Sequence, residues 1–540
     1  MFKVLYRKSR WLHKYIGLFL ILFLMWMSLS GIVLNHPRVV ANLSVPRWLI
    51  PPAYKIKNWN RSSLIGLVYT HQQPHVLYAY GKKGVWKSSD GGRSFVPMQN
   101  GLARSLYYLK TNHLFLWEKG KPFLLAATDG GLYRAYLSDE HWQKIALPFE
   151  HEAVKKIIYA PPKLLVFTES HVYQTAFPVK KWDFEPVQLK REGEQNRVTL
   201  VKLFFDLHDG NVLGLPGRLL VDFVGLLLFF MSFSGFYIWF NPWRWRRRSK
   251  RQKTVQAIGR SKINFLRGLI QYHLKIGIYV ALFFFILGGT AFFMRPPFLA
   301  VIADGTIPSR YYPGKLCPNP WHEKIQNALF DARRQRILIA AADGLWQGKA
   351  DFSQPFKKVH YHVPMFVMGP TYFESIGGMY RIGSFNGLYD LDPDRNQSVD
   401  LLTGKVVTAY SNIRPGKWMV TGYFRLPTGK AFITTHRQGL LALDSKKPPA
   451  HFPVPRLMNR SYTLSLWNYM FELHNGRIFQ DVIGGLYILI PPLGAFLFVI
   501  ITLTGIFDWI YIKLRRLKIA DTNQKDYINI HTFEFRIRRK

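Results

Sequence analysis

The stretch Phe205-Asp-Leu-His208-Asp-Gly210 opens an apolar helix, and it returns far downstream as Phe471-Glu-Leu-His474-Asn-Gly476 before another. Two further apolar segments begin with His13-x-x-Ile-Gly17 and with His273-x-x-Ile-Gly277. The chain therefore consists of two copies of one unit, and each copy contains a helix, a large loop and a second helix. Each copy carries one histidine at the start of each helix.

Four segments are apolar and long enough to cross a bilayer, which takes about 20 helical residues. The first and third contain no charged residue, and the second contains only Asp222. Such runs with basic flanks predict membrane spans rather than the central helices of a soluble protein. The four spans are Tyr15–Leu34, Leu219–Phe240, Ile276–Met294 and Gly485–Phe507.

Lysine and arginine gather before the first span, between the second and third, and after the fourth. The positive-inside rule places these three segments in the cytoplasm and the two long loops outside. The formal net charge of +41 is compatible with nucleic-acid binding. However, the densest basic runs adjoin the spans, where they set topology and meet anionic lipid. We therefore expect the lipid bilayer, and no nucleic acid, as a partner.

The expected order of segments follows from these spans. It is a cytoplasmic lead and first span (1–37), a first set of β blades (38–205), a second span (206–240), a basic cytoplasmic loop (241–275), a third span (276–295), a second set of β blades (296–470), a fourth span (471–512) and a cytoplasmic tail (513–540).

Both long loops contain short β-type runs separated by Gly, Asp and Pro. The stretch Ser88-x-Asp90-x-Gly92-x-Ser94-Phe95 matches the Asp-box hairpin, and Gly-Leu-aromatic triplets recur at roughly the spacing of one propeller blade. We count about three blades in each loop, so the two loops together predict one β-propeller of about six blades. Two separate β-domains are the alternative. The Asp box occurs in sialidases without being their active site, and no glycosidase motif accompanies it.

The four repeated histidines are the candidate cofactor ligands. His13 and His273 belong to the starts of two parallel spans, and His208 and His474 to the starts of the other two. A pseudo-twofold axis along the membrane normal brings each pair together across the bundle. Two facing imidazoles are the axial ligands that a b-type haem needs, and helix bundles build cofactor sites in this way. We therefore expect about two b-type haems, with these four histidines on the haem iron.

Neighbouring residues fit the same hypothesis. Gly17 and Gly277 lie four residues after their histidines, on the same helix face, where a missing Cβ lets a flat macrocycle approach the backbone. Close helix packing is their alternative role. Arg218 and Arg477 are candidates for pairing with haem propionates, or for anchoring the spans at the interface. His36 is an alternative ligand in the outer pair.

Other cofactors are less compatible with the sequence. A zinc site takes three or four ligands at one place, whereas these histidines are divided between two membrane faces. The single cysteine, Cys317, excludes an internal disulfide and the Cys-x-x-Cys-His attachment of c-type haem. No flavin or nicotinamide fingerprint is present. Electrons would then come from quinol or from a separate reductase.

The pattern Arg10-Trp-Leu-His13-x-x-Ile-Gly17 with Ser30-Gly31, followed by Leu207-His208-x-Gly210 and Ser234-Gly235-x-x-x-Trp239, resembles the PepSY-associated transmembrane family. That family includes bacterial inner-membrane proteins of iron uptake, among them a ferric-siderophore reductase with two b-type haems. The resemblance covers the four spans. The outside loops depart from it, because Asp-box blades replace the PepSY modules.

The sequence as a whole predicts a membrane α-helical four-span bundle of two pseudo-symmetric repeats, joined to an all-β periplasmic domain. The resemblance implies an inner-membrane dihaem protein, with both termini cytoplasmic, that reduces a ferric siderophore or another periplasmic acceptor. The alternative is a non-enzymatic membrane anchor that presents the propeller as a binding platform.

Overall fold

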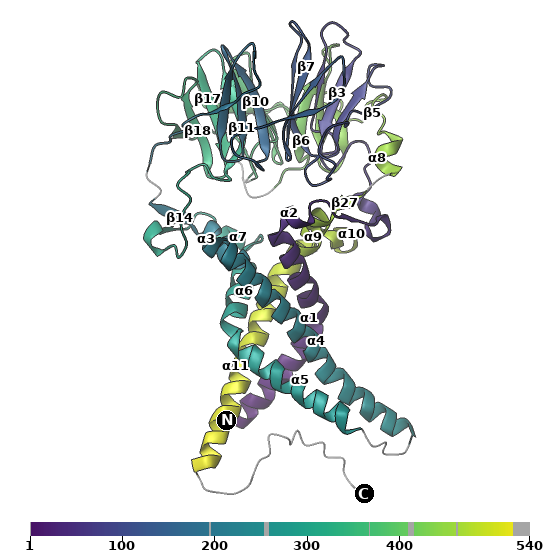
Figure 1. Cartoon of the computed structure of the whole chain (residues 1–540), viewed down its shortest axis with the longest axis vertical. Coiled ribbons are helices and arrows are strands. Elements are labelled where there is room, and N and C mark those ends of the chain that lie inside the picture. Colours follow the sequence, from purple (N-terminus) through teal and green to yellow (C-terminus); the bar gives the residue numbers. More distant parts are fainter. Residues whose placement is uncertain are drawn as a thin grey trace. The chain divides into compact units, whose positions relative to one another are not determined.

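The computed structural model describes residues 2–193, 196–252, 259–366, 368–408, 415–460 and 463–521 (Figure 1). The chain divides into two compact units. The membrane unit consists of Met1–Arg38, Asn196–Lys315 and Tyr469–Lys540. The β unit consists of Val39–Gln195 and Leu316–Asn468. Each unit thus combines segments from both sequence copies, and each is described below by itself.

Among the described residues of the membrane unit, three helices are long and apolar enough to cross a membrane (Figure 1). They are α1 (Phe2–Asn35), α4 (Gly214–Gln252) and α11 (Ile490–Asp521). The shared core between them contains Leu20 and Leu24 of α1, Val224 and Leu228 of α4, and Phe498 of α11. Large apolar side chains also remain on the outer faces of these helices, as lipid contact requires.

The third expected span is not one straight helix. It divides into α5 (Arg260–Tyr279) and α6 (Ala281–Phe293), which meet at Val280 at an angle of 63°. By length and composition, the described part of the membrane unit therefore has three helices suited to span a membrane, or four spans if this bent pair counts as one. Gly277 weakens the helix close to the bend. Gly17 stands at the matching position of α1, which is unbroken, so glycine alone does not cause the bend.

The repeated histidine stretches also differ from expectation, because each one ends a short helix instead of opening a long one. His208 is in the last turn of α3 (Leu200–Asp209), and His474 ends α9 (Leu466–His474). Gly210 and Gly476 then adopt left-handed conformations with φ of 81° and 69°. Such a glycine stops a helix, because other residues are strained there.

Short connections follow before each long helix. Turn η3 (Asn211–Leu213) precedes α4, and η5 (Arg477–Phe479), α10 (Gln480–Ile483) and η6 (Gly484–Leu489) precede α11. The basic lead and most of the expected 241–275 loop are helical, as parts of α1, α4 and α5. Of the expected 513–540 tail, only the part up to Asp521 lies within the described residues. The small elements of this unit are α7 (Leu299–Ile302), η4 (Ser309–Tyr311), and strands β14 (Arg197–Thr199) and β15 (Thr306–Pro308).

In its described residues, the β unit contains six antiparallel sheets of three or four strands, three from each segment of the chain. The first segment forms β2 (Gly66–Tyr69), β3 (Leu77–Gly81), β4 (Gly84–Ser88) and β5 (Val96–Pro97); β6 (Thr111–Trp117), β7 (Phe123–Thr128), β8 (Gly131–Tyr136) and β9 (Gln143–Ile145); and β10 (Val154–Ala160), β11 (Lys163–Thr168), β12 (Val172–Ala176) and β13 (Glu185–Pro186).

The second segment forms β16 (Ile325–Asp331), β17 (Arg336–Ala341), β18 (Gly344–Lys349) and β19 (Lys357–Val359); β20 (Tyr372–Ile376), β21 (Met379–Ser384), β22 (Gly387–Asp392) and β23 (Gln397–Asp400); and β24 (Val420–Arg425), β25 (Ala431–Thr435) and β26 (Gly439–Ala442). Outside these sheets, β1 (Ser44–Val45) pairs with β27 (Leu464–Ser465), and short helices lie at α2 (Pro37–Val40), η1 (Arg47–Leu49), η2 (Pro52–Tyr54) and α8 (Arg456–Arg460).

The six sheets follow one another like the blades of a propeller (Figure 1). The first strand of each sheet contacts the first strand of the next, and β24 of the last sheet contacts β2 of the first. Apolar side chains fill the space between neighbouring blades, as where Tyr78 and Val85 pack against Leu124 and Ala126. The two loops therefore form one β-propeller-like unit, and the alternative of two separate β-domains is wrong.

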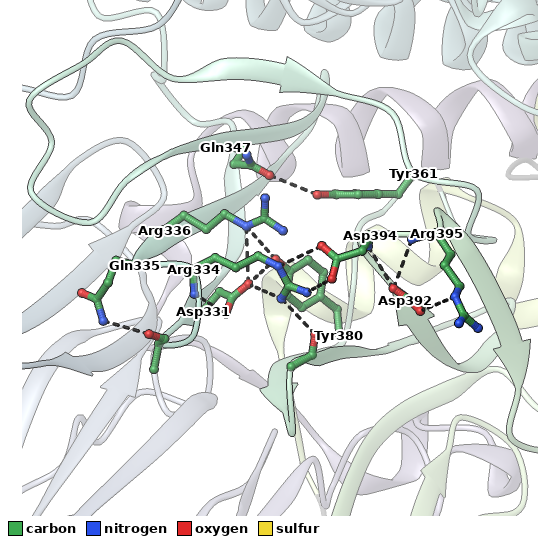
Figure 2. A network of polar contacts seen from close by, with 12 residues as sticks. Asp331, Arg334, Gln335, Arg336, Gln347, Tyr361, Tyr380, Asp392, Asp394 and Arg395 are labelled. Carbon is green, nitrogen blue, oxygen red and sulfur yellow. Dashed lines mark hydrogen bonds and ion pairs between the residues drawn. The ribbon is translucent and has the colours of Figure 1, made fainter.

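Polar networks also join the blades. Figure 2 shows the buried carboxylate of Asp331, at the end of β16, which accepts hydrogen bonds from Tyr380 of the next sheet (2.6 Å) and from Arg334 (3.0 Å). Arg334 also pairs with Asp394. Burial alone would raise the pKa of Asp331, but the Tyr380 and Arg334 hydrogen bonds outweigh it and lower that pKa. This network fixes two adjacent blades of the second segment.

Candidate functional site

The structure brings His208 and His474 together in the membrane unit. Their ring centroids are 6.4 Å apart, and the ring planes meet at 69°. The two residues end α3 and α9, which are matching elements of the two sequence copies. We call them the outer pair. Each lies shortly before the N-terminal end of a long helix, where the chain returns from a large loop.

Each of the four histidines is held at Nδ1 by a hydroxyl from another helix. The Nδ1 atom of His474 lies 2.8 Å from Ser30 Oγ, and that of His208 lies 3.1 Å from Thr290 Oγ1. The same arrangement recurs at His273, whose Nδ1 is 2.8 Å from Ser234 Oγ, and at His13, whose Nδ1 is 3.2 Å from Thr504 Oγ1.

These contacts determine which ring nitrogen carries the proton. The hydroxyl protons are already donated within their own helices, as from Ser30 to the Trp26 carbonyl (2.6 Å) and from Thr290 to the Ile286 carbonyl (2.7 Å). The hydroxyl oxygen therefore accepts from Nδ1–H. For His13, Nδ1 also lies 2.9 Å from the Ile501 carbonyl, which can only accept. The Nε2 atom is then unprotonated, and within the described part of the chain it forms no hydrogen bond in any of the four.

The contacts also cross between the two copies. Each histidine of the first copy, His13 and His208, is held by a threonine of the second copy. Each histidine of the second copy, His273 and His474, is held by a serine of the first. A pseudo-twofold exchange of this kind fixes the two copies against each other, and it orients all four imidazoles in an equivalent way.

Three of the hydroxyl residues are followed by a glycine that leaves room for the imidazole. A Cβ on Gly505 would lie 3.2 Å from His13 Cε1, one on Gly235 would lie 3.4 Å from His273 Cε1, and one on Gly31 would lie 3.7 Å from His474 Cε1. Ala291 takes the fourth place, after Thr290. The Ser/Thr-Gly pairs therefore serve as seats for the histidine rings.

The expected macrocycle glycines occupy different surroundings. A Cβ on Gly17 would meet no atom within 4 Å, so the face of α1 beside His13 is open. A Cβ on Gly277 would lie 3.1 Å from the end of the Met231 side chain. The space that a flat ligand needs is thus present at Gly17, whereas at Gly277 a flexible methionine fills it.

These observations allow a test of whether a bis-histidine haem fits. A metal–imidazole bond of about 2 Å, with about 1 Å from nitrogen to ring centre, separates two axial imidazole centroids by about 6 Å. The outer pair has a separation of 6.4 Å. A metal-binding histidine normally donates its other ring N–H to a protein oxygen, as all four do here. The residues of the outer pair fit the group in spacing and tautomer.

The inner pair consists of His13 on α1 and His273 on α5. Their hydroxyl partners are on α11 and α4. The four ligand candidates therefore come from four different helical segments. The inner pair therefore has the same Nδ1–hydroxyl contacts as the outer pair, at the first of the two histidines in each sequence copy.

The remaining candidate residues already have protein partners. His36 Nε2 lies 2.5 Å from Asp222 Oδ2, so the nitrogen that a haem iron would need is in use. Arg477 pairs with Glu472 (3.1 Å), and Arg218 donates to Asn211 Oδ1 (2.9 Å). Both arginines keep further N–H groups, since a guanidinium has five donors. In the structure, His36 Nε2 is thus engaged by Asp222 and is not free for a metal ion.

The sequence patterns included the pairs Ser30-Gly31 and Ser234-Gly235 without indicating a role for them, and they gave no weight to Thr290 and Asn35. A signal for Thr290 was available, because it stands 17 residues after His273, as Ser30 stands 17 after His13. For Asn35 and Asp222, the only signal was a lone charged residue in an apolar span, which is costly unless it has a use.

The β unit holds a separate cavity of about 470 Å³, lined by the first strands of five sheets. Inside it, Lys156 pairs with Glu374, and His113 Nε2 lies 3.8 Å from the same carboxylate. Burial, together with the nearby Lys156 ammonium, holds the pKa of His113 well below its usual range. His113 Nδ1 is buried and forms no hydrogen bond within the described residues. The described residues contain no group of three or more His, Cys, Asp or Glu side chains that could hold a metal ion.

A family model described as PepSY-associated TM region matches residues 10–510. No curated protein matches the chain. Solved structures of related shape include an extracellular domain from B. thetaiotaomicron described as part of a one-component system (12% identity, TM-score 0.32), the GH74 xyloglucanase from Xanthomonas campestris (8%, 0.33) and YCF48 from Cyanidioschyzon merolae (11%, 0.28). Each match covers 72% of this chain, and it covers 39%, 46% and 96% of the other chains, respectively. At these scores, the likenesses carry no functional information.

Proposed function

The chain belongs to the PepSY-associated transmembrane family, and from this premise we propose that it is a dihaem electron-transfer protein of the bacterial inner membrane. It would reduce a periplasmic acceptor, a ferric siderophore or another ferric chelate, in iron uptake. One observation carries the proposal: four histidines with Nδ1–H bonded to protein oxygens and Nε2 unpaired, two of them at an axial-ligand separation.

The protein residues have distinct tasks in this proposal. His208 and His474 would hold one b-type haem, and His13 and His273 the other. When bound, the haems supply one-electron transfer, which the side chains of the chain do not provide. The hydroxyls of Ser30, Thr290, Ser234 and Thr504 fix the tautomer and orientation of the rings, which keeps each Nε2 aimed and basic.

The surroundings of the rings set the conditions for electron transfer. Apolar side chains of α1, α4, α6 and α11 form one buried core in the same bundle, which would limit the access of water to the bound haems. Low polarity and exclusion of solvent are among the factors by which a protein tunes a haem potential. One electron delivered to a ferric chelate would weaken binding, because oxygen-rich chelators hold Fe(II) less tightly than Fe(III). The β unit, which lacks a recognisable redox motif in its sequence, would shape access for the acceptor.

Orientation is part of the proposal. The Lys and Arg runs place both termini and the segment between α4 and α5 in the cytoplasm. Alkaline phosphatase fused after Asp351 should therefore be active, and the same reporter fused after Arg248 should be inactive. An active fusion at Arg248 would contradict the map.

The deciding experiment is an optical spectrum of the full-length protein purified from haem-replete cells. We expect a low-spin bis-histidine spectrum that changes on addition of dithionite, and about two haems per chain by pyridine haemochrome assay. A protein that folds as a monodisperse species without a Soret band would remove the electron-transfer function and leave a membrane-anchored binding platform.

A further inference from the structure

A second polar cluster lies in the membrane unit, apart from the four histidines. Asp222 is 9% exposed and belongs to the apolar part of α4. Its two carboxylate oxygens are both engaged, one 2.5 Å from His36 Nε2 and the other 2.9 Å from Asn35 Nδ2. A carboxylate in a membrane span is costly to keep, so an ionisable pair there calls for a function.

The second sequence copy shares the hydroxyl–histidine contacts but lacks this cluster. The position 12 residues before Ser234 is Asp222, whereas the position 12 before Thr504 is Pro492. Arg295 and Pro296 stand where Asn35 and His36 stand in the first copy. The bundle therefore does not need the pair for its architecture, since the hydroxyl–histidine contacts are equivalent in both copies.

The cluster adjoins both the lipid and the outer pair. Leu219 and Leu226 lie about one turn before and after Asp222 on α4, and they are 54% and 55% exposed. Because these apolar side chains face outward in a spanning helix, the hydrocarbon phase reaches this side of α4. On its other side, Asn35 Nδ2 also reaches the carbonyl oxygen of Asp209 (3.3 Å), the residue directly after His208.

We propose that His36, Asp222 and Asn35 form a quinol-oxidation site beside the outer pair. This inference rests on the proposed function, and it names the electron donor for it. A quinol is a lipid-soluble donor whose hydroxyl needs a proton acceptor, and an imidazole–carboxylate pair is such an acceptor. Asn35 supplies the amide that holds the carboxylate in place and links it to the backbone next to an axial ligand.

The reaction balances with the groups of the proposed function. A quinol that becomes a quinone breaks two O–H bonds and gives up two electrons and two protons. The haems of the proposed function, when bound, would supply the acceptors for these electrons, one electron each. His36, whose Nε2–H is donated to the Asp222 carboxylate, would accept the first proton at Nδ1, with Asp222 as the counter-charge of the resulting imidazolium, and would release it to the aqueous side at the end of α1. The second proton follows by the same residues once His36 is neutral again.

The test uses the full-length protein with its haems in lipid nanodiscs, under anaerobic conditions. Decylubiquinol is mixed with the oxidised protein in a stopped-flow instrument, and the ferrous haem band is followed. We expect reduction of the wild type, and a rate at least tenfold lower in Asp222→Asn and in His36→Gln. Asp481→Asn, which removes an exposed carboxylate from α10 of the second copy, is the matched control and should react like the wild type.

Two further measurements keep the outcomes separate. Dithionite should reduce both haems fully in every variant, so haem loss would mark failure of the proposed function and not of this site. Equilibrium binding of decylubiquinone to the oxidised protein should weaken several-fold in His36→Gln and remain unchanged in Asp481→Asn. The quinol site is overturned if variants with both haems react at the wild-type rate. It is also overturned if decylubiquinol fails to reduce a wild type that dithionite reduces, whether or not the variants fold.

Discussion

The two copies within the membrane unit agree at their histidines and differ at their ends. In both, a Ser or Thr of one copy holds Nδ1 of a histidine of the other, at 2.8–3.2 Å. Only the first copy carries the Asn35–His36–Asp222 cluster, and only the second has a bend of 63° between its first two helical segments. The shared residues therefore define two equivalent pairs of histidines, whereas the cluster and the bend make the two copies unequal.

The agreement teaches which features are tied to a ligand. Symmetric packing alone would require apolar complementarity, but not four imidazoles with the same tautomer. Under the proposed function, the differences would mark where the donor and the acceptor meet the two sites. An electron carrier with two identical ends would have no preferred path, whereas a proton-accepting pair at one site would set where electrons enter.

The largest expected effect comes from loss of an axial ligand. His208→Ala or His474→Ala should remove the outer haem, and His13→Ala or His273→Ala the inner one, so the haem content should fall from about two to about one per chain. The pyridine haemochrome assay measures this loss. His322→Ala, in the β unit, should keep both haems.

The comparison between copies would break if one variant removed both haems, because the two sites would then depend on each other. It would also break if His36→Ala stripped the outer haem while His474→Ala did not. Either result would require a different assignment of the pairs. The second result would be unexpected, because His36 Nε2 contacts Asp222 in the structure.

A smaller effect should follow from removal of the hydroxyls that hold the rings. Ser30→Ala, Ser234→Ala and Thr504→Val should each weaken haem binding about 10–100-fold, the usual cost of losing an outer-shell partner of a metal ligand. Transfer of haem to excess apomyoglobin measures the affinity.

Each of these helices supplies a matched control two residues earlier. Ser28, Ser232 and Thr502 donate to carbonyls of their own helices, at 2.9 Å, and within the described residues they form no hydrogen bond with a histidine. Ser28→Ala, Ser232→Ala and Thr502→Val should therefore leave haem transfer unchanged. Equal losses in the control and test variants would mean that the hydroxyls stabilise the helices and not the ligands.

The sequence predicted the parts of this architecture that depend on local pattern. Apolar length marked the helices, turn residues marked the blades, and the repeat of His208 and His474 marked the outer pair. The cross-copy hydrogen bonds could not be predicted, because they join residues such as His13 and Thr504 that are close only after the helices pack. The bend at Val280 was missed for the same reason, since the matching segment at Gly17 stays helical.

A finer test uses the glycines that seat the rings. Added Cβ atoms would lie 3.2 Å from the imidazole at Gly505, 3.4 Å at Gly235 and 3.7 Å at Gly31. Alanine should therefore disturb haem binding most at Gly505, less at Gly235 and hardly at Gly31, because overpacking rises steeply with overlap. Ala291 already occupies the fourth place, so Ala291→Gly should be tolerated. Haem transfer rates in the reverse order would show that the contact of an added Cβ with the imidazole does not control haem binding.

The smallest expected effect extends the comparison to the two halves of the β unit, which share their blades but not their turns. In the first half, the Asp90 carboxylate accepts hydrogen bonds from the Ser94 amide (2.9 Å) and hydroxyl (2.6 Å). These bonds lower the pKa of Asp90 to about 2. A carboxylate with a depressed pKa contributes stability that is complete above its unfolded pKa of about 3.9, and this contribution is lost as the pH falls toward 2.

Hydrogen exchange of residues 88–95, corrected for intrinsic rates, should therefore lose protection between about pH 4 and pH 2. The turn at 384–388 in the second half, which contains no carboxylate, should change little over that range. Ser94→Ala should shift the loss at 88–95 to higher pH, because it removes the largest of the bonds that hold the pKa down. An unchanged pH profile in that variant would mean that the backbone, and not the carboxylate, closes the turn.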